Sequence, residues 1–255
     1  METVSHHGRK TAYEFHDRGG EGAPMLCVHG SGGSSGVWKS QARLAEEQPV
    51  VALDLSGHGE SEDTDAEAGF STLSAYADDV IAVAEETDSR VLVGNSLGGA
   101  ILLHITLYRE FEPEALVLTG TGAKLAVLED LLAWLSNDFE HAVDFLHEPE
   151  HLFHDADEEL VSLSRESMRN CGRAVVERDF RSCHTFDVRG DLSEIDTPTL
   201  AIYGEHDRLT PPHYHEYLAE TIPDCELAVI ENAAHMVMLE RPDEFNRTVL
   251  DFLAQ

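Results

Sequence analysis

Ser96 is the residue whose surroundings point most directly to chemistry, because it stands in the run GNSLG between two apolar segments. Residues 91–93 read as a short buried strand, and residues 97–108 have the length and composition of a helix. The pattern G-x-S-x-G at a strand-to-helix turn is typical of a nucleophile elbow, whose sharp bend exposes the serine hydroxyl. The pattern therefore indicates nucleophilic catalysis by Ser96.

A serine hydroxyl is a weak nucleophile, so it needs a histidine to accept its proton and a carboxylate to orient that histidine. Two later apolar runs end in such groups. "TLAIYGEHD" leads to Asp207 and "ELAVIENAAH" leads to His235. Glu205 is the alternative carboxylate, and no acid follows the run at 115–120. We predict that Ser96, Asp207 and His235 form a catalytic triad, with Asp207 favoured over Glu205.

Acyl transfer also requires hydrogen-bond donors for the negative oxygen that develops in the transition state. The backbone N–H of Leu97 follows the nucleophile and lies at the positive end of a helix. A second donor can come from the loop "HGSGG" at residues 29–33, whose glycines permit close approach of a ligand. Ser31 is the predicted donor in this loop, and Gly32 is the alternative.

The elements that must position these groups alternate along the chain. Apolar runs with the near-continuous hydrophobicity of strands covered on both faces lie at 25–30, 49–57, 90–96, 115–120, 199–204 and 226–231. Helical patterns lie at 38–47, 73–86, 97–109, 212–221 and 242–253, and a hairpin around Gly8 adds an antiparallel edge. The alternation predicts an α/β fold with a doubly wound, mostly parallel sheet.

One interval interrupts this alternation. From about residue 123 to residue 190 no run resembles a strand, and the segments at 128–147 and 157–180 are amphipathic helical patterns. The interval is too long for a loop. We expect residues 1–122 and 191–255 to form the core, and residues 123–190 to form an inserted helical lid.

The chain resembles capped α/β-hydrolase fold enzymes of the esterase, lipase and lactonase type. The motifs "HGSGG", "DLSGHGES", "GNSLGG", "PTLAIYGEHDRLTPP" and "AAHMVMLERPDEFN" follow in family order and cover nearly the whole chain outside the lid. The chain order of serine, acid and histidine is also that of the family. The resemblance implies Ser96 as nucleophile, His235 as general base and acid, Asp207 as orienting carboxylate, Ser31 and Leu97 as oxyanion donors, and no cofactor.

Some positions depart from related families. Ser56 stands where relatives usually carry arginine, which would alter a salt bridge near the site, and Ala233 and Ala234 replace the glycines that commonly precede the histidine. Haloalkane dehalogenases and epoxide hydrolases use aspartate at the position of Ser96, and carbon–carbon hydrolases often place tryptophan at that of Met236. These differences narrow the expected reaction to hydrolysis of a carboxylic ester, lactone or thioester.

The expected function is therefore that of a serine hydrolase, which cleaves small to medium uncharged carboxylic esters through an acyl-enzyme on Ser96. The alternatives are an enol-lactonase or a cofactor-free perhydrolase with the same catalytic residues. A third alternative is a binding protein that has kept the fold and lost turnover. The expected partner is a small-molecule ester or lactone, while the physiological substrate and the oligomeric state are left open.

Composition excludes several other classes. The chain holds 49 Asp and Glu against 17 Lys and Arg, and its net charge of −32 repels nucleic acid and anionic membranes. Few lysines and many dispersed carboxylates resemble proteins of halophiles, in which molar salt screens such repulsion. The absence of a signal-like apolar run leads us to expect a cytoplasmic protein.

The cysteines and histidines of the chain give no strong site by spacing alone. Four scattered cysteines are expected to be reduced thiols, and Cys27 to be a small core residue. The stretch "HEPEHLFHD" at 147–155 matches no dedicated zinc pattern, so no metal site is predicted.

Overall fold

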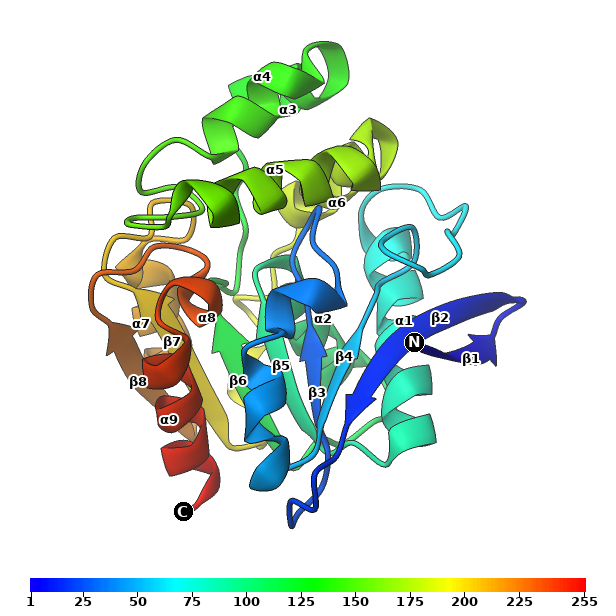
Figure 1. Cartoon of the computed structure of the whole chain (residues 1–255), viewed down its shortest axis with the longest axis vertical. Coiled ribbons are helices and arrows are strands. Elements are labelled where there is room, and N and C mark those ends of the chain that lie inside the picture. The colour runs from blue at the N-terminus through cyan, green and yellow to red at the C-terminus, as the bar shows by residue number, and fades with distance from the viewer.

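Eight strands form one sheet in the order β1-β2-β4-β3-β5-β6-β7-β8 in the computed structural model, which describes residues 1–255 (Figure 1). The antiparallel hairpin of β1 and β2 forms one edge, and β2 pairs antiparallel with β4. The remaining strands, β4, β3, β5, β6, β7 and β8, run parallel to one another. The strands are β1 (Glu2–His6), β2 (Arg9–His16), β3 (Met25–Val28), β4 (Val50–Leu53), β5 (Val91–Asn95), β6 (Ala115–Thr119), β7 (Thr199–Gly204) and β8 (Cys225–Ile230). The predicted fold class and the edge hairpin are confirmed.

Helices cover both faces of this sheet, and each face has its own hydrophobic core. The helices outside the 123–190 interval are α1 (Phe70–Thr87), α2 (Leu97–Tyr108), α7 (Pro212–Thr221), α8 (Val237–Glu240) and α9 (Pro242–Leu253). Every residue of β3, β4, β5 and β6 is buried, which accounts for their uninterrupted apolar sequences. None of the helices is both long enough and apolar enough to cross a membrane.

The helix expected at 38–47 is wrong in type. Two short 3-10 helices, Ser35–Trp38 and Gln41–Glu46, occupy this region, and a third lies at Leu192–Glu194. Ser34 caps the first by accepting a hydrogen bond from the Gly36 N–H, and the chain begins a new turn after Ser40. Such short turns still bury Trp38 against the sheet.

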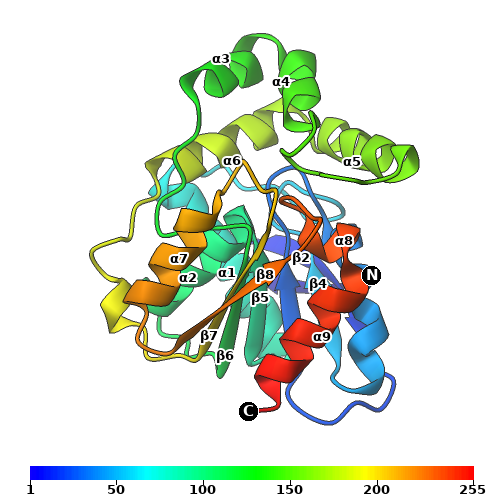
Figure 2. The ribbon, with the colours of Figure 1, turned by 90° about the vertical axis from the view of Figure 1, so that its left-hand side faces the viewer.

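Residues 123–190, called the helical segment below, contain four helices and none of the sheet strands. These are α3 (Glu129–Asn137), α4 (Phe139–Leu146), α5 (Glu158–Cys171) and α6 (Arg173–Thr185). The expected pattern at 128–147 is divided at Asp138, and the one at 157–180 is divided at Gly172, whose φ of 89° lies outside the helical region. Figures 1 and 2 show these helices stacked beyond the carboxyl ends of the central strands.

The start of α2 packs so closely against β3 that a side chain there has no room. A Cβ atom added to Gly98 would clash with the backbone oxygen of Val28. We expect Gly98→Ala to lower the free energy of unfolding by about 1–3 kcal/mol, because the overpacked helix must shift. The control is Gly190→Ala, at a residue with open space around it, which should change stability by less than about 0.5 kcal/mol. Urea unfolding measures both, and equal midpoints for the two variants would contradict this account.

Candidate active site

Ser96 occupies a strained turn between β5 and α2. Its φ of 56° and ψ of −116° are unfavourable for a residue with a Cβ atom, so its surroundings must hold it there. The Ser96 N–H donates to the Thr119 carbonyl at 2.9 Å, and the Thr121 hydroxyl donates to the Ser96 carbonyl at 2.9 Å. The sharp bend predicted for a nucleophile elbow is therefore present, and Thr119 at the end of β6 and Thr121 just after it hold it in place.

The predicted base and acid are in direct contact. The Nδ1 atom of His235 lies 2.9 Å from Oδ2 of Asp207, and both side chains are almost completely buried. Asp207 also accepts hydrogen bonds from the backbone N–H groups of Leu209 and Thr210 at 2.8 and 2.9 Å. Glu205 instead accepts from the backbone N–H of Asn232. The geometry thus places Asp207, and not Glu205, beside the imidazole.

Asp207 stays ionised in spite of its burial. Burial raises the pKa of a carboxyl, but the charge of His235 and the hydrogen bonds from His235 and Thr210 outweigh it and lower the pKa of Asp207. The Thr210 hydroxyl donates to Asp207 Oδ2 at 2.7 Å. Sequence reasoning missed Thr210, although its position three residues after the acid is the spacing at which a local hydroxyl can bond back.

A cavity of about 730 Å³ joins the groups that the sequence singled out. Ser96 and His235 both line it, together with Ser31 and Gly32 of the loop after β3. The cavity runs between this end of the sheet and the helical segment, whose Leu131 and Phe145 also line it. Trp134, Phe139 and Phe153 of the same segment do not line it and belong instead to the hydrophobic core on this side of the sheet.

The two predicted oxyanion donors lie next to the serine. Leu97 is the first residue of α2, where a backbone N–H has no partner within the helix. The loop that carries Ser31 passes so close to Ser96 that a Cβ on Gly30 would lie 3.1 Å from the serine Cβ. Leu97 is therefore adjacent to the serine in the chain, and Ser31 follows a glycine that packs against the serine.

Ser56, which stands where relatives usually carry arginine, lies beside a carboxylate that another residue neutralises. Ser56 donates its hydroxyl to Asp79 at 2.9 Å, and Arg9 from strand β2 supplies the guanidinium that pairs with Asp79 at 3.0 Å. The carboxylate next to Ser56 is thus paired with a guanidinium from another strand.

A buried ion pair near the site was not predicted. His58 Nε2 lies 3.0 Å from Oδ2 of Asp179 on α6, and neither side chain is exposed. Burial would lower the pKa of His58, but the charge and hydrogen bond of Asp179 raise it well above its usual value. Burial would raise the pKa of Asp179, but the charge of His58 lowers it. The sequence could not reveal this pair, because 121 residues separate its members.

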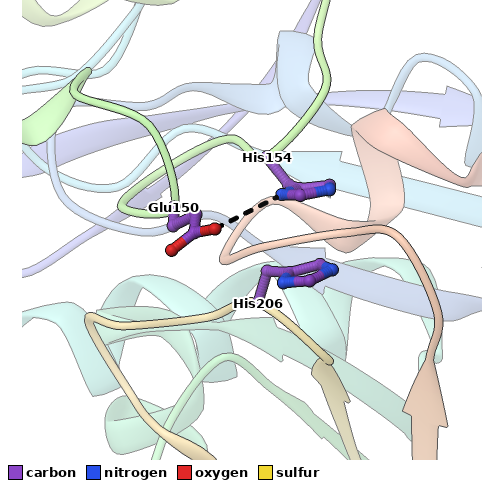
Figure 3. Close-up of side chains that lie close together, drawn as sticks. All are labelled: Glu150, His154 and His206. Carbon is purple, nitrogen blue, oxygen red and sulfur yellow. Dashed lines mark ion pairs between the residues drawn. The ribbon is translucent and has the colours of Figure 1, made fainter.

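A cluster of two histidines and a glutamate joins the helical segment to the loop that carries Asp207 (Figure 3). The rings of His154 and His206 stack 3.7 Å apart in nearly parallel planes, with Glu150 beside them. Glu150 pairs with Arg208, and its carboxylate lies 3.9 Å from Nδ1 of His154. A metal ion must lie near the plane of each imidazole that binds it, and two parallel stacked rings offer no common point. The cluster therefore acts as a contact between two loops.

The parallel sheet, the elbow serine after β5 and the paired acid and histidine after β7 and β8 define an α/β hydrolase. A model of the alpha/beta hydrolase family matches residues 25–248, and the chain belongs to this family. A pimeloyl-[acyl-carrier protein] methyl ester esterase of Neisseria meningitidis is 28% identical over 248 residues, which cover 90% of this chain and 93% of the relative.

Solved structures give the same result. A thermophilic esterase is 32% identical with a TM-score of 0.85, covering 99% of this chain and 96% of its own. An N-acyl homoserine lactone degrading enzyme is 27% identical with a TM-score of 0.86, covering 98% of this chain and all of its own.

The His58–Asp179 pair predicts a loss of stability at alkaline pH. Because the folded-state pKa of His58 is raised, its contribution is complete below the usual value of 6.5 and is lost as pH rises through the raised pKa. We expect the free energy of unfolding of the wild type, minus that of His58→Gln, to fall by up to about 1.4 kcal/mol per pH unit above 6.5. Urea titrations between pH 6 and pH 10 measure this difference. A difference that is constant over that range would contradict the pairing.

Proposed function

We propose that the protein hydrolyses carboxylic esters through an acyl-enzyme on Ser96. The observation that carries this proposal is the Asp207–His235 hydrogen bond at a cavity that Ser96 also lines. In the proposed reaction the Ser96 hydroxyl attacks the carbonyl carbon while His235 takes its proton. His235 then returns that proton to the leaving alcohol, and water with the same base releases the acid.

The proposed role of each remaining group follows from its position. Asp207 bonds Nδ1 of His235, so the opposite ring nitrogen, Nε2, is the one left to exchange protons with Ser96. The N–H groups of Leu97 and Ser31 are the proposed donors to the oxyanion. We also propose that the helical segment acts as the lid of the cavity, because its side chains form the wall opposite the sheet.

The lining of the cavity indicates the substrate class. No Asp or Glu lines it, although the chain has 49, and its only Lys or Arg residues are Lys39 and Arg208. Half of the 36 lining residues are hydrophobic, and they include the exposed Leu128 and Leu163 on the helical segment. Such a surface favours an apolar acyl chain. It offers no carboxylate to a cationic substrate.

Substitution of the nucleophile tests the reaction itself. Ser96→Ala should lower kcat/KM for p-nitrophenyl butyrate about 10⁴-fold, because no hydroxyl remains to form the acyl-enzyme. Ser71→Ala, at an exposed serine on α1, should leave the rate unchanged. Turnover of the ester is measured in molar salt and in dilute buffer. Turnover of a simple lactone, and of peroxide with acetate, is measured under the same conditions. Equal rates for the wild type and Ser96→Ala would refute the proposal, and a strong preference for the lactone would favour a lactonase.

A fluorophosphonate probe separates an enzyme from a binding protein that has kept the fold. Such a probe should label the wild type and not Ser96→Ala, because labelling requires the activated hydroxyl. A folded wild type that resists the probe would favour the binding protein.

A charge placed in the apolar lining tests the substrate class. Leu163→Asp should raise KM for p-nitrophenyl octanoate about 5- to 10-fold and leave the acetate ester within about 2-fold, since only a long chain reaches this wall. The matched control is Leu227→Asp, which places the same charge at an exposed leucine of β8 outside the cavity. Initial rates over a series of acyl lengths measure the effect. An equal change for both esters would contradict the assigned acyl site.

A further inference from the structure

Two helices of the helical segment hold the loop that carries the proposed oxyanion donor. From α6, Asp179 accepts a hydrogen bond from the Ser31 hydroxyl at 2.9 Å. From α5, the Ser167 hydroxyl donates to the carbonyl of Gly32 at 3.1 Å. A Cβ on Gly32 would lie 2.9 Å from the side chain of Met168, so α5 also packs directly on this residue. Two consecutive residues of the loop are thus held from the same side.

Asp179 is the central group of this contact. It belongs to the helical segment and is completely buried, yet its hydrogen-bond partners all come from the core. Tyr76 on α1 donates to Oδ1 at 2.6 Å, while His58 and Ser31 bond Oδ2 at 3.0 and 2.9 Å. A buried carboxylate with one partner removed is costly, so this group strongly favours the arrangement in which all three partners are in place.

The charge of His58 makes the Asp179 carboxylate compatible with a nearby oxyanion. An unpaired negative charge beside the loop would oppose the negative oxygen of the transition state. The imidazole of His58 pairs with Asp179 and offsets that charge. His29 also holds this loop. Its Nε2 accepts a hydrogen bond from the Leu55 N–H, so Nδ1 carries the proton and donates to the Gly30 carbonyl at 2.7 Å. The loop is therefore held at Gly30 as well as at Ser31 and Gly32.

We propose that Asp179 is a positioning residue, which holds Ser31 so that the backbone N–H of this loop faces the oxyanion when the helical segment is seated. This inference rests on the proposed function, because it assigns Asp179 to the same ester hydrolysis. The oxyanion hole is then complete only when α6 is packed against the core. An enzyme whose helical segment is displaced would bind substrate but stabilise the transition state poorly.

Substitution on each side of the Ser31–Asp179 hydrogen bond tests this role. Ser31→Ala keeps the backbone donor and removes only the hydroxyl, whereas Asp179→Asn removes the charge and leaves a weaker amide acceptor. Each should lower kcat for p-nitrophenyl butyrate about 10-fold with KM within about 2-fold, since a misplaced oxyanion donor affects the transition state more than the ground state. The losses in the double variant should be less than multiplicative, because both changes act on the same Ser31–Asp179 contact. Ser31→Thr, which keeps a hydroxyl, should restore most of the rate.

The matched control is Ser136→Ala, which removes a hydroxyl–carboxylate hydrogen bond of 2.7 Å to Glu177 inside the helical segment. It should leave kcat unchanged. Should Asp179→Asn fail to fold, Ser31→Ala and Ser31→Thr decide the question, because they alter no charge. A folded Ser31→Ala with a kcat within 2-fold of the wild type, or multiplicative losses in the double variant, would overturn the positioning role alone. A wild type without turnover that depends on Ser96 would overturn the proposed function as well.

Discussion

The parallel direction of β3, β5, β7 and β8 is the constraint on which the rest of the structure depends. Because these strands end at one edge of the sheet, the loops that follow them bring together Ser31, Ser96, Asp207 and His235 from positions spread over most of the chain. The hydrogen bond between Asp207 and His235 then fixes which ring nitrogen is free. Strain at Ser96 persists because the strand beside it, β6, holds its backbone.

Charge is distributed so that the excess of acid stays away from the cavity. A chain with a net charge of −32 could easily place a carboxylate against a bound substrate, yet none lines this cavity. Asp207 and Asp179 bond the lining residues His235 and Ser31, and each of these carboxylates is buried against a histidine. Pairing lowers the pKa of both carboxyls in spite of burial, which keeps them available as hydrogen-bond acceptors. The helical segment contributes apolar lining together with one such acceptor.

The features that depend on a local sequence pattern were the ones that could be predicted. Continuous apolar runs gave the strands, and the turn at Ser96 and the segments ending in Asp207 and His235 gave the residues that meet at the cavity. The helix at 38–47 was predicted wrongly because the hydrophobic pattern does not distinguish an α-helix from two 3-10 turns broken after Ser40. The contacts of Asp179 could not be predicted, since a carboxylate between arginines in a charged amphipathic helix looks like many solvated ones until the tertiary fold buries it. The division of the helical segment from the core, at 123 and 190, stays a prediction.

The most direct test of the central claim is to trap the acyl group during turnover. Acid quenching of the wild type within the first turnover of p-nitrophenyl butyrate, followed by peptide mass spectrometry, should show one butyryl group on the peptide that contains Ser96. The same experiment with His235→Ala should show a much slower approach to that adduct. A butyryl group on a different residue, or hydrolysis by a wild type that never carries an acyl group, would contradict the account.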